Sequence, residues 1–85
     1  MHYTYVLQSK KDGDRYIGCT HDLKKRFVEH NSGKVTSTKN RRPFTLIYYE
    51  ACLNKDDAFQ RERYLKRRWG SKYLATRLKK YYENV

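Results

Sequence analysis

The chain has 85 residues, with 20 Lys and Arg against 9 Asp and Glu, which gives a formal net charge of +11 at pH 7. A chain of this length fits one domain, residues 1–85, and it contains neither a secretory signal nor the roughly 18 consecutive apolar residues that cross a bilayer, so we expect a cytoplasmic, non-membrane protein. With 15% aromatic residues the composition is not that of a disordered chain, and the excess of positive charge points to nucleic acid as the partner.

The beginning of the chain predicts a β-hairpin. Polar and apolar residues alternate over residues 3–8, which is typical of a strand, and residues 15–19 form a second short strand. The Asp-Gly pair at 12–13 is a strong hairpin turn signal, so the two strands run antiparallel. A two-residue turn at this pair places Tyr16 on the same face as Tyr5.

The next segment predicts a helix and a basic loop. The apolar spacing becomes helical over residues 22–31, with His30 on the inward side. Thr20 or Asp22 can cap the start of this helix, and Gly33 is a plausible left-handed stop. The polar residues that follow, up to Pro43, indicate a loop.

The rest of the chain predicts one strand and two helices. Residues 45–51 are rich in β-branched and aromatic side chains, which favours a third strand. Asn54 is a good N-cap for a helix that runs to about Trp69, where Gly70 breaks it before a last helix over residues 71–82. The order β-β-α-β-α-α predicts an α+β fold in which helices cover a small sheet.

Glu62 is the residue that fits a purely structural role least well. Ala58, Leu65 and Trp69 form one apolar arc on the predicted helix, and Glu62 lies inside that arc. A carboxylate is almost never buried without a partner, because its desolvation is costly. Glu62 is therefore either paired with an arginine of another element or held inward to ligate a metal ion.

Two further side chains are candidates by position. Arg26 and His30 lie four residues apart and project from nearly the same side of their helix. A histidine among apolar neighbours is usually a satisfied core residue, but it is also the side chain that titrates nearest to neutral pH. Asp22 is an ordinary i,i+4 partner for Arg26. Tyr5 and Tyr16, taken singly, are typical strand tyrosines.

The basic residues fall into patches on the helices and in the loop. Dispersed cations favour contacts to phosphates without sequence readout. The expected nucleic-acid-binding residues are Lys24, Lys25, Lys34, Lys39, Arg41, Arg42 and Lys66.

Several short motifs occur in the order of a known signature. The segments are YTY at 3–5, YIG at 16–18, DLKKR at 22–26, EHNSG at 29–33 and AFQRERYLK at 58–66, followed by a tail over 69–79. Together they resemble the GIY-YIG endonuclease superfamily, and the later segments resemble its single-domain bacterial members. Tyr3 and Thr4 stand where the first motif has Gly and Ile, so that only its tyrosine remains.

The resemblance implies a three-stranded antiparallel sheet flanked by helices, and hydrolysis of phosphodiester bonds with one divalent ion, Mg²⁺ or Mn²⁺. By position, Tyr5 and Tyr16 match the tyrosines of the first two motifs, and Arg26 matches the helix arginine. His30 matches a histidine found in many members, and Glu62 matches the glutamate that ligates the metal. The resemblance and the helical periodicity thus single out the same carboxylate.

The roles of these residues follow from what phosphodiester cleavage requires. The forked, permanently charged guanidinium of Arg26 suits the non-bridging phosphate oxygens. Either Tyr5 or His30 could take the proton of the attacking water, and Tyr16 could equally position that water.

The leading hypothesis is a metal-dependent endonuclease that acts on DNA rather than RNA, in repair or processing. We expect a monomer, and for its targeting three alternatives stay open: broad cleavage, cleavage of particular DNA structures only, or dependence on a separate protein partner. A non-catalytic, basic nucleic-acid-binding module with the nuclease fold is the alternative, and a ribosome-associated basic protein is a third possibility that rests on charge alone.

Overall fold

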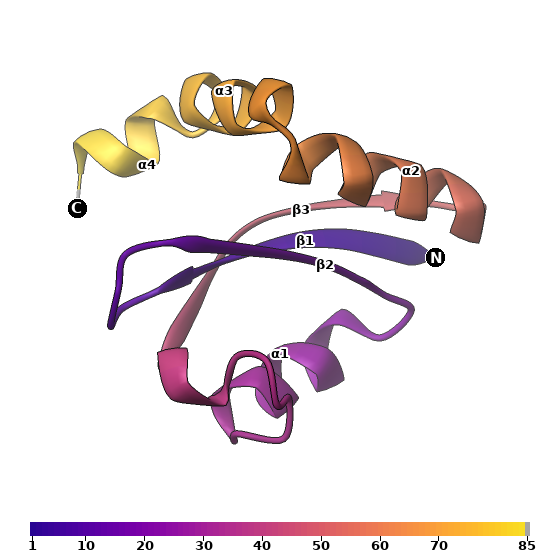
Figure 1. The fold of residues 1–85 in the computed structure, drawn as a ribbon. Helices are drawn as coiled ribbons and strands as arrows, with labels where there is room; N and C mark the ends of the chain where they lie inside the picture. The colour runs from indigo at the N-terminus through magenta and orange to yellow at the C-terminus, as the bar shows by residue number, and fades with distance from the viewer. Residues whose placement is uncertain (85) are drawn as a thin grey trace.

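A three-stranded antiparallel sheet lies between two layers of helices (Figure 1). The computed structural model describes residues 1–84, and Val85, the last residue of the expected domain, lies outside the described residues. The elements are β1 (His2–Ser9), β2 (Arg15–Thr20), α1 (Leu23–Asn31), the short 3-10 helix η1 (Lys39–Arg41), β3 (Phe44–Cys52), α2 (Lys55–Lys66), α3 (Arg68–Arg77) and α4 (Lys79–Glu83). The strand order is β2-β1-β3, which confirms the predicted α+β fold. No helix within residues 1–84 is long and apolar enough to span a bilayer.

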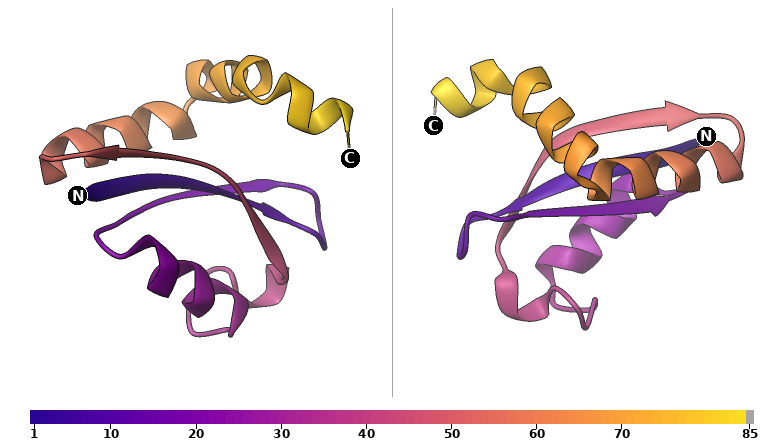
Figure 2. Two further views of the ribbon diagram at one scale, coloured as in Figure 1. Left: turned by 180° about the vertical axis from the view of Figure 1, so that it is seen from behind. Right: turned by 45° about the horizontal axis from the view of Figure 1, so that its top comes forward.

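The alternation of β1 divides the core into two parts, because successive side chains of a strand point to opposite faces. Figure 2 shows the two layers from further directions, with α1 covering one face and α2, α3 and α4 the other. On the α1 face the buried residues are Tyr5, Leu7 and Phe44, packed with the partly buried Tyr16, Leu23, Phe27 and Leu46. On the opposite face they are Val6, Ile17, Leu65, Leu74 and Leu78.

The hairpin turn is longer than the predicted two residues. Leu7 pairs with Tyr16 rather than with Gly18, the partner that a two-residue turn would give it. The reason is Ser9, whose Oγ accepts hydrogen bonds from two backbone N–H groups of the turn, at 3.1 Å each. The parity of the pairing is nevertheless as predicted, so Tyr16 and Tyr5 share a face.

The predicted helix ends are confirmed where they depend on local hydrogen bonds. Asp22 caps α1 by accepting from the N–H of Lys25 at 3.1 Å, and Gly33 follows that helix at a φ of 81°. Asn54 caps α2 by accepting from the N–H of Asp56 at 2.8 Å.

The predicted break at Gly70 is wrong. The second helix ends at Lys66, and Gly70 is buried inside α3. A Cβ on Gly70 would lie 2.3 Å from Leu65 Cα, so this glycine lets the first turn of α3 pack directly against the end of α2. Trp69 therefore belongs to α3 and is 66% exposed instead of extending the apolar arc of α2. The expected last helix is divided at Leu78 into α3 and α4.

Candidate active site

The candidate site is built around the edge strand β2. Tyr5, on the central strand β1, pairs with Gly18 on β2. A Cβ on Gly18 would lie 2.4 Å from the Tyr5 hydroxyl oxygen, so the phenol passes over a position that must have no side chain. The glycine of the YIG motif thus makes room for Tyr5 beside the edge strand.

A buried chain of hydrogen bonds holds the Tyr5 hydroxyl. His30 is 0% exposed, its Nε2 lies 2.8 Å from Tyr5 Oη, and its Nδ1 lies 2.8 Å from Thr38 Oγ1. The Thr38 hydroxyl donates to the carbonyl of Val35 at 3.4 Å. It therefore accepts from the Nδ1–H of His30, which leaves Nε2 to accept the hydrogen bond from Tyr5.

Burial keeps both partners of this hydrogen bond uncharged at neutral pH. It raises the pKa of Tyr5 from 10.0 to about 12, although the Arg26 guanidinium beside the hydroxyl opposes this effect. Burial, with a smaller contribution from the positive charge of Arg26, lowers the pKa of His30 from 6.5 to about 4. A phenol and a neutral imidazole therefore face each other.

Tyr16 and Arg26 complete this side of the site. The Tyr16 ring packs edge-on against His30, with centroids 4.9 Å apart, and also contacts the ring of Tyr5. Arg26 forms a salt bridge with Glu29 at 3.3 Å, and its side chain is 37% exposed. The predicted partner, Asp22, instead accepts from a backbone N–H as the cap of α1, so its carboxylate is already used.

Glu62 approaches β2 from the opposite face of the sheet. Its side chain is 17% exposed, and its salt-bridge partner among residues 1–84 is Lys66, one turn later on α2. The sequence allowed an arginine of another element as the partner of Glu62. In the structure it is Glu50 on β3 that pairs with an arginine, Arg61 on α2, at 2.9 Å. The carboxylate of Glu62 faces Cys19, where it adds to the burial that raises the pKa of the thiol.

Glu62 is also near Tyr5. Its negative charge is among the smaller causes that raise the pKa of Tyr5, after burial. Tyr5 belongs to the core on the α1 face, whereas Glu62 lies on α2, on the opposite face, beside Cys19 of β2. Tyr5, Tyr16, Arg26 and His30 are thus gathered on one side of β2 and Glu62 on the other.

The donor groups suit an ion that is open to substrate. No group of three or more His, Cys, Asp or Glu among residues 1–84 is arranged to enclose a metal. Mg²⁺ commonly keeps several waters and binds through one or two carboxylates plus the phosphates of a substrate. The partly exposed carboxylate of Glu62 fits that mode, provided that the Lys66 ammonium moves aside.

Two of the predicted nucleic-acid-binding residues support the fold. Arg41 binds Asp12 at 2.8 Å and lowers the pKa of that carboxyl to about 2, which ties the loop to the hairpin. Arg42 donates to the carbonyl of Lys39 at 2.7 Å and packs against Gly33. Within residues 1–84, the remaining predicted cations that form no salt bridge are Lys24, Lys25, Lys34 and Lys39.

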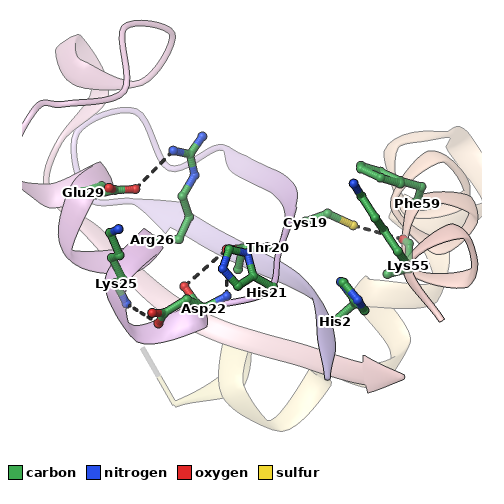
Figure 3. Close-up of a pocket in the computed structure, with 11 residues that line it drawn as sticks. His2, Cys19, Thr20, His21, Asp22, Lys25, Arg26, Glu29, Lys55 and Phe59 are labelled. Atoms are coloured by element: carbon green, nitrogen blue, oxygen red, sulfur yellow. Dashed lines mark hydrogen bonds and ion pairs between the residues drawn. The ribbon is translucent and has the colours of Figure 1, made fainter. Parts of the chain in front are cut away.

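Two cavities flank the site along β2. One, of about 390 Å³, lies between α1 and α2 and includes Arg26 and Phe59 in its walls (Figure 3). The other, of about 330 Å³, includes Tyr16 and Lys66. Phe59 was not predicted from the sequence, because one phenylalanine at the margin of an apolar arc has no distinguishing signal. Thr38 was not predicted either, because its contact with His30 depends on how the loop folds back.

The comparisons with known proteins agree with this fold. The family model of the GIY-YIG catalytic domain matches residues 1–81. The chain therefore belongs to the GIY-YIG family, a nuclease family, as its motifs predicted. Its relatives within that family are UPF0213 proteins, whose name specifies no activity.

One relative is a UPF0213 protein of Bacillus pumilus (strain SAFR-032), 48% identical over 62 residues, which cover 72% of this chain and 62% of the relative. The match therefore spans less than two thirds of that protein. The UPF0213 protein YazA of Bacillus subtilis (strain 168) is 45% identical over 67 residues, which cover 78% of this chain and 67% of YazA. The solution NMR structure of the UPF0213 protein BH0048 from Bacillus halodurans superposes with a TM-score of 0.55 and 36% identity, covering 88% of this chain and 82% of that one.

Proposed function

We propose that the protein is an endonuclease that hydrolyses phosphodiester bonds in DNA with the help of one divalent ion, Mg²⁺ or Mn²⁺, in repair or processing. The observation that carries this proposal is the arrangement around β2. Tyr5 Oη is hydrogen-bonded to the buried His30, and Glu62 approaches from the other side of the same strand. A proton acceptor and a carboxylate ligand at one edge are the two parts that hydrolysis of a phosphodiester requires.

Tyr5 and His30 act as a pair in this proposal. The Nε2 of His30 is positioned to take the proton of Tyr5, and the Arg26 guanidinium lies beside the same hydroxyl. Tyr5 Oη accepts the proton of the attacking water as it passes its own proton to His30. A phenol with a pKa of about 12 is not ionised at neutral pH, which favours such a relay over a standing phenolate.

Arg26 couples substrate binding to that proton transfer. Its guanidinium binds the non-bridging oxygens of the phosphate. The positive charge of Arg26 contributes to the low pKa of His30, so neutralising that charge with a phosphate raises the pKa of His30 and makes it a better acceptor. Tyr16 packs on His30 and keeps the ring in place.

Glu62 is the proposed ligand of the ion. The bound ion would act as a Lewis acid that stabilises negative charge on the phosphate and on the leaving oxygen. Lys66 pairs with the carboxylate of Glu62, so this ammonium would have to leave the carboxylate free for an ion. The predicted phosphate contacts come from the basic residues that form no salt bridge within the described part of the chain, residues 1–84, above all Lys24 and Lys25 beside Arg26 on α1.

Cleavage of supercoiled plasmid by the purified protein in Mg²⁺ or Mn²⁺ tests the proposal. We expect relaxed or linear product, no product in EDTA, and a loss of at least about 100-fold in rate for Glu62→Gln. The matched control is Glu83→Gln, which changes an exposed carboxylate on α4 and should cut at the wild-type rate. Plasmid that is retarded but never cut, or equal rates for wild type and Glu62→Gln, would support the non-catalytic binding module instead.

A further inference from the structure

The cavity between α1 and α2 has the dimensions of a site for one small ring system. Its volume is about 390 Å³, within the range of ligand pockets. Figure 3 shows Arg26 and Glu29 on one side, Phe59 and Lys55 on the other, and Cys19 and Thr20 of β2 between them.

One wall of this cavity is formed by an aromatic ring with a lysine beside it. Phe59 is 40% exposed although it sits next to the fully buried Ala58. Lys55 Nζ lies 5.6 Å from the centroid of the Phe59 ring, so a cation is held beside the ring. The Cys19 thiol donates to the carbonyl of Ala58 at 3.1 Å, and burial raises its pKa, so it adds no negative charge to the wall.

The cations that line the cavity, Lys25, Arg26 and Lys55, outnumber its carboxylates, Asp22 and Glu29. Asp22 caps α1, and Glu29 is paired with Arg26. The ammonium groups of Lys25 and Lys55 form no salt bridge within residues 1–84. A planar ring that carries a phosphate therefore meets an aromatic surface and unpaired positive charges in the same place.

The position of the cavity relates it to the cleavage site. Arg26 lines the cavity and also lies beside the Tyr5 hydroxyl. A phosphate on Arg26 therefore places the adjoining nucleotide at the mouth of the cavity. A base that is paired and stacked in a duplex cannot enter such a space, whereas an unpaired base can.

We propose that this cavity binds the base of an unpaired nucleotide next to the scissile phosphate, stacked on Phe59, so that the substrates are single-stranded or locally unpaired DNA. The proposal rests on the nuclease function proposed above for the identity of the neighbouring phosphate. It adds the substrate class, which the catalytic residues do not specify.

Binding measured in EDTA tests the proposal without any cleavage. A short fluorescent single strand and the duplex of the same sequence are titrated with wild type, Phe59→Ala, Phe59→Tyr and Leu53→Ala. We expect Phe59→Ala to weaken binding of the single strand roughly 5- to 100-fold and to leave duplex binding within about twofold. Phe59→Tyr retains a ring and should bind as the wild type does. Leu53 is 84% exposed and outside the cavity, so Leu53→Ala controls for the loss of an exposed apolar side chain.

Two results would overturn the proposal. One is an equal affinity of wild type and Phe59→Ala for the single strand, and the other is an equal loss of affinity of Phe59→Ala for the single strand and for the duplex. A circular dichroism melt of Phe59→Ala distinguishes a binding defect from unfolding. If the Phe59→Ala protein is unfolded, Phe59→Leu is used in its place. The same titration with an RNA strand distinguishes DNA from RNA as the source of the base. The binding titration measures no cleavage. A failure of the nuclease proposal therefore appears only in the plasmid assay, and a failure of the base-binding proposal appears only in the titration.

Discussion

The hydroxyl of Tyr5 owes its position to residues from separate parts of the chain. Gly18 leaves space for the ring, and His30 Nε2 accepts a hydrogen bond from Tyr5 Oη, which lies 2.8 Å away. Thr38 holds the far side of the imidazole and selects its tautomer. Within residues 1–84 no buried side-chain nitrogen or oxygen lacks a hydrogen-bond partner, so this polar cluster is compatible with a stable core.

The buried His30 should make stability depend on pH. Its pKa is about 4 in the folded protein and about 6.5 in the unfolded chain, so between these values the unfolded state binds a proton that the folded state does not. The free energy of unfolding should therefore fall by roughly 3 kcal/mol as the pH decreases from 6.5 to 4. Urea unfolding across this range should show a weaker pH dependence in His30→Gln than in wild type.

An identical pH dependence in the two proteins would contradict this account. If His30→Gln does not fold, NMR titration of the wild-type imidazole gives the same test. A pKa near 6.5 for His30 would then show that burial does not keep the ring neutral.

The sequence predicted which side chains to examine, but not how they meet. Glu62 was marked by its place in an apolar arc, and the structure does place its side chain inward at 17% exposure. The arginine expected as one possible partner of Glu62 is not found among residues 1–84, where Lys66 forms the salt bridge instead. Thr38 could not be predicted, because its contact depends on the path of a loop and not on any local pattern.

At the scale of elements, locally determined features were predictable and tertiary ones were not. The caps Asp22 and Asn54 depend on hydrogen bonds within a few residues; Asn54 was predicted from the sequence, and Asp22 was one of two candidates beside Thr20. Gly70 resembles a helix stop in sequence, yet its role is to let α3 contact the end of α2. The hairpin register depends likewise on Ser9, which no turn rule for residues 12–13 includes.

Gly70→Ala should be destabilising although alanine favours helices. In a free helix this change stabilises by about 1 kcal/mol. Here the new Cβ would lie 2.3 Å from Leu65 Cα and 2.4 Å from the Tyr64 carbonyl oxygen, both backbone atoms, so we expect a loss of roughly 2–3 kcal/mol in urea unfolding. Ser71→Ala, at the exposed next position, should stay within about 0.5 kcal/mol of wild type. A Gly70→Ala protein at least as stable as wild type would contradict the packing of α3 on α2.

At the scale of the whole molecule, the two helical layers leave β2 as an edge strand (Figure 1). The candidate catalytic groups and both flanking cavities lie along this edge. The net charge of +11 surrounds it with positive potential, which draws nucleic acid to the site without specifying a sequence. A site between two layers can therefore be reached by a strand that runs along β2.

Binding to duplex DNA should weaken steeply with salt, because phosphate contacts release counterions. Each contact contributes about 0.9 to the slope of log K against log salt concentration. Changing Lys24, Lys25 and Lys34 together to glutamine should reduce that slope by up to about 2.7. The control Lys79→Gln/Lys80→Gln on α4, which removes two exposed cations away from these residues, should leave the slope nearly unchanged. An unaltered slope in the triple variant would show that the phosphate contacts are made by another surface.

The most direct test of the central claim, that Tyr5 and Glu62 act together at the β2 edge, is the rate of plasmid nicking by wild type, Tyr5→Phe, Glu62→Gln and the double variant. Tyr5→Phe keeps the buried ring and removes only the hydroxyl, which donates a hydrogen bond to His30. We predict that each single variant is slower by at least about 100-fold and that the double variant is no slower than the slower single one, because the residues serve one step. Cleavage by either single variant at the wild-type rate would contradict the claim.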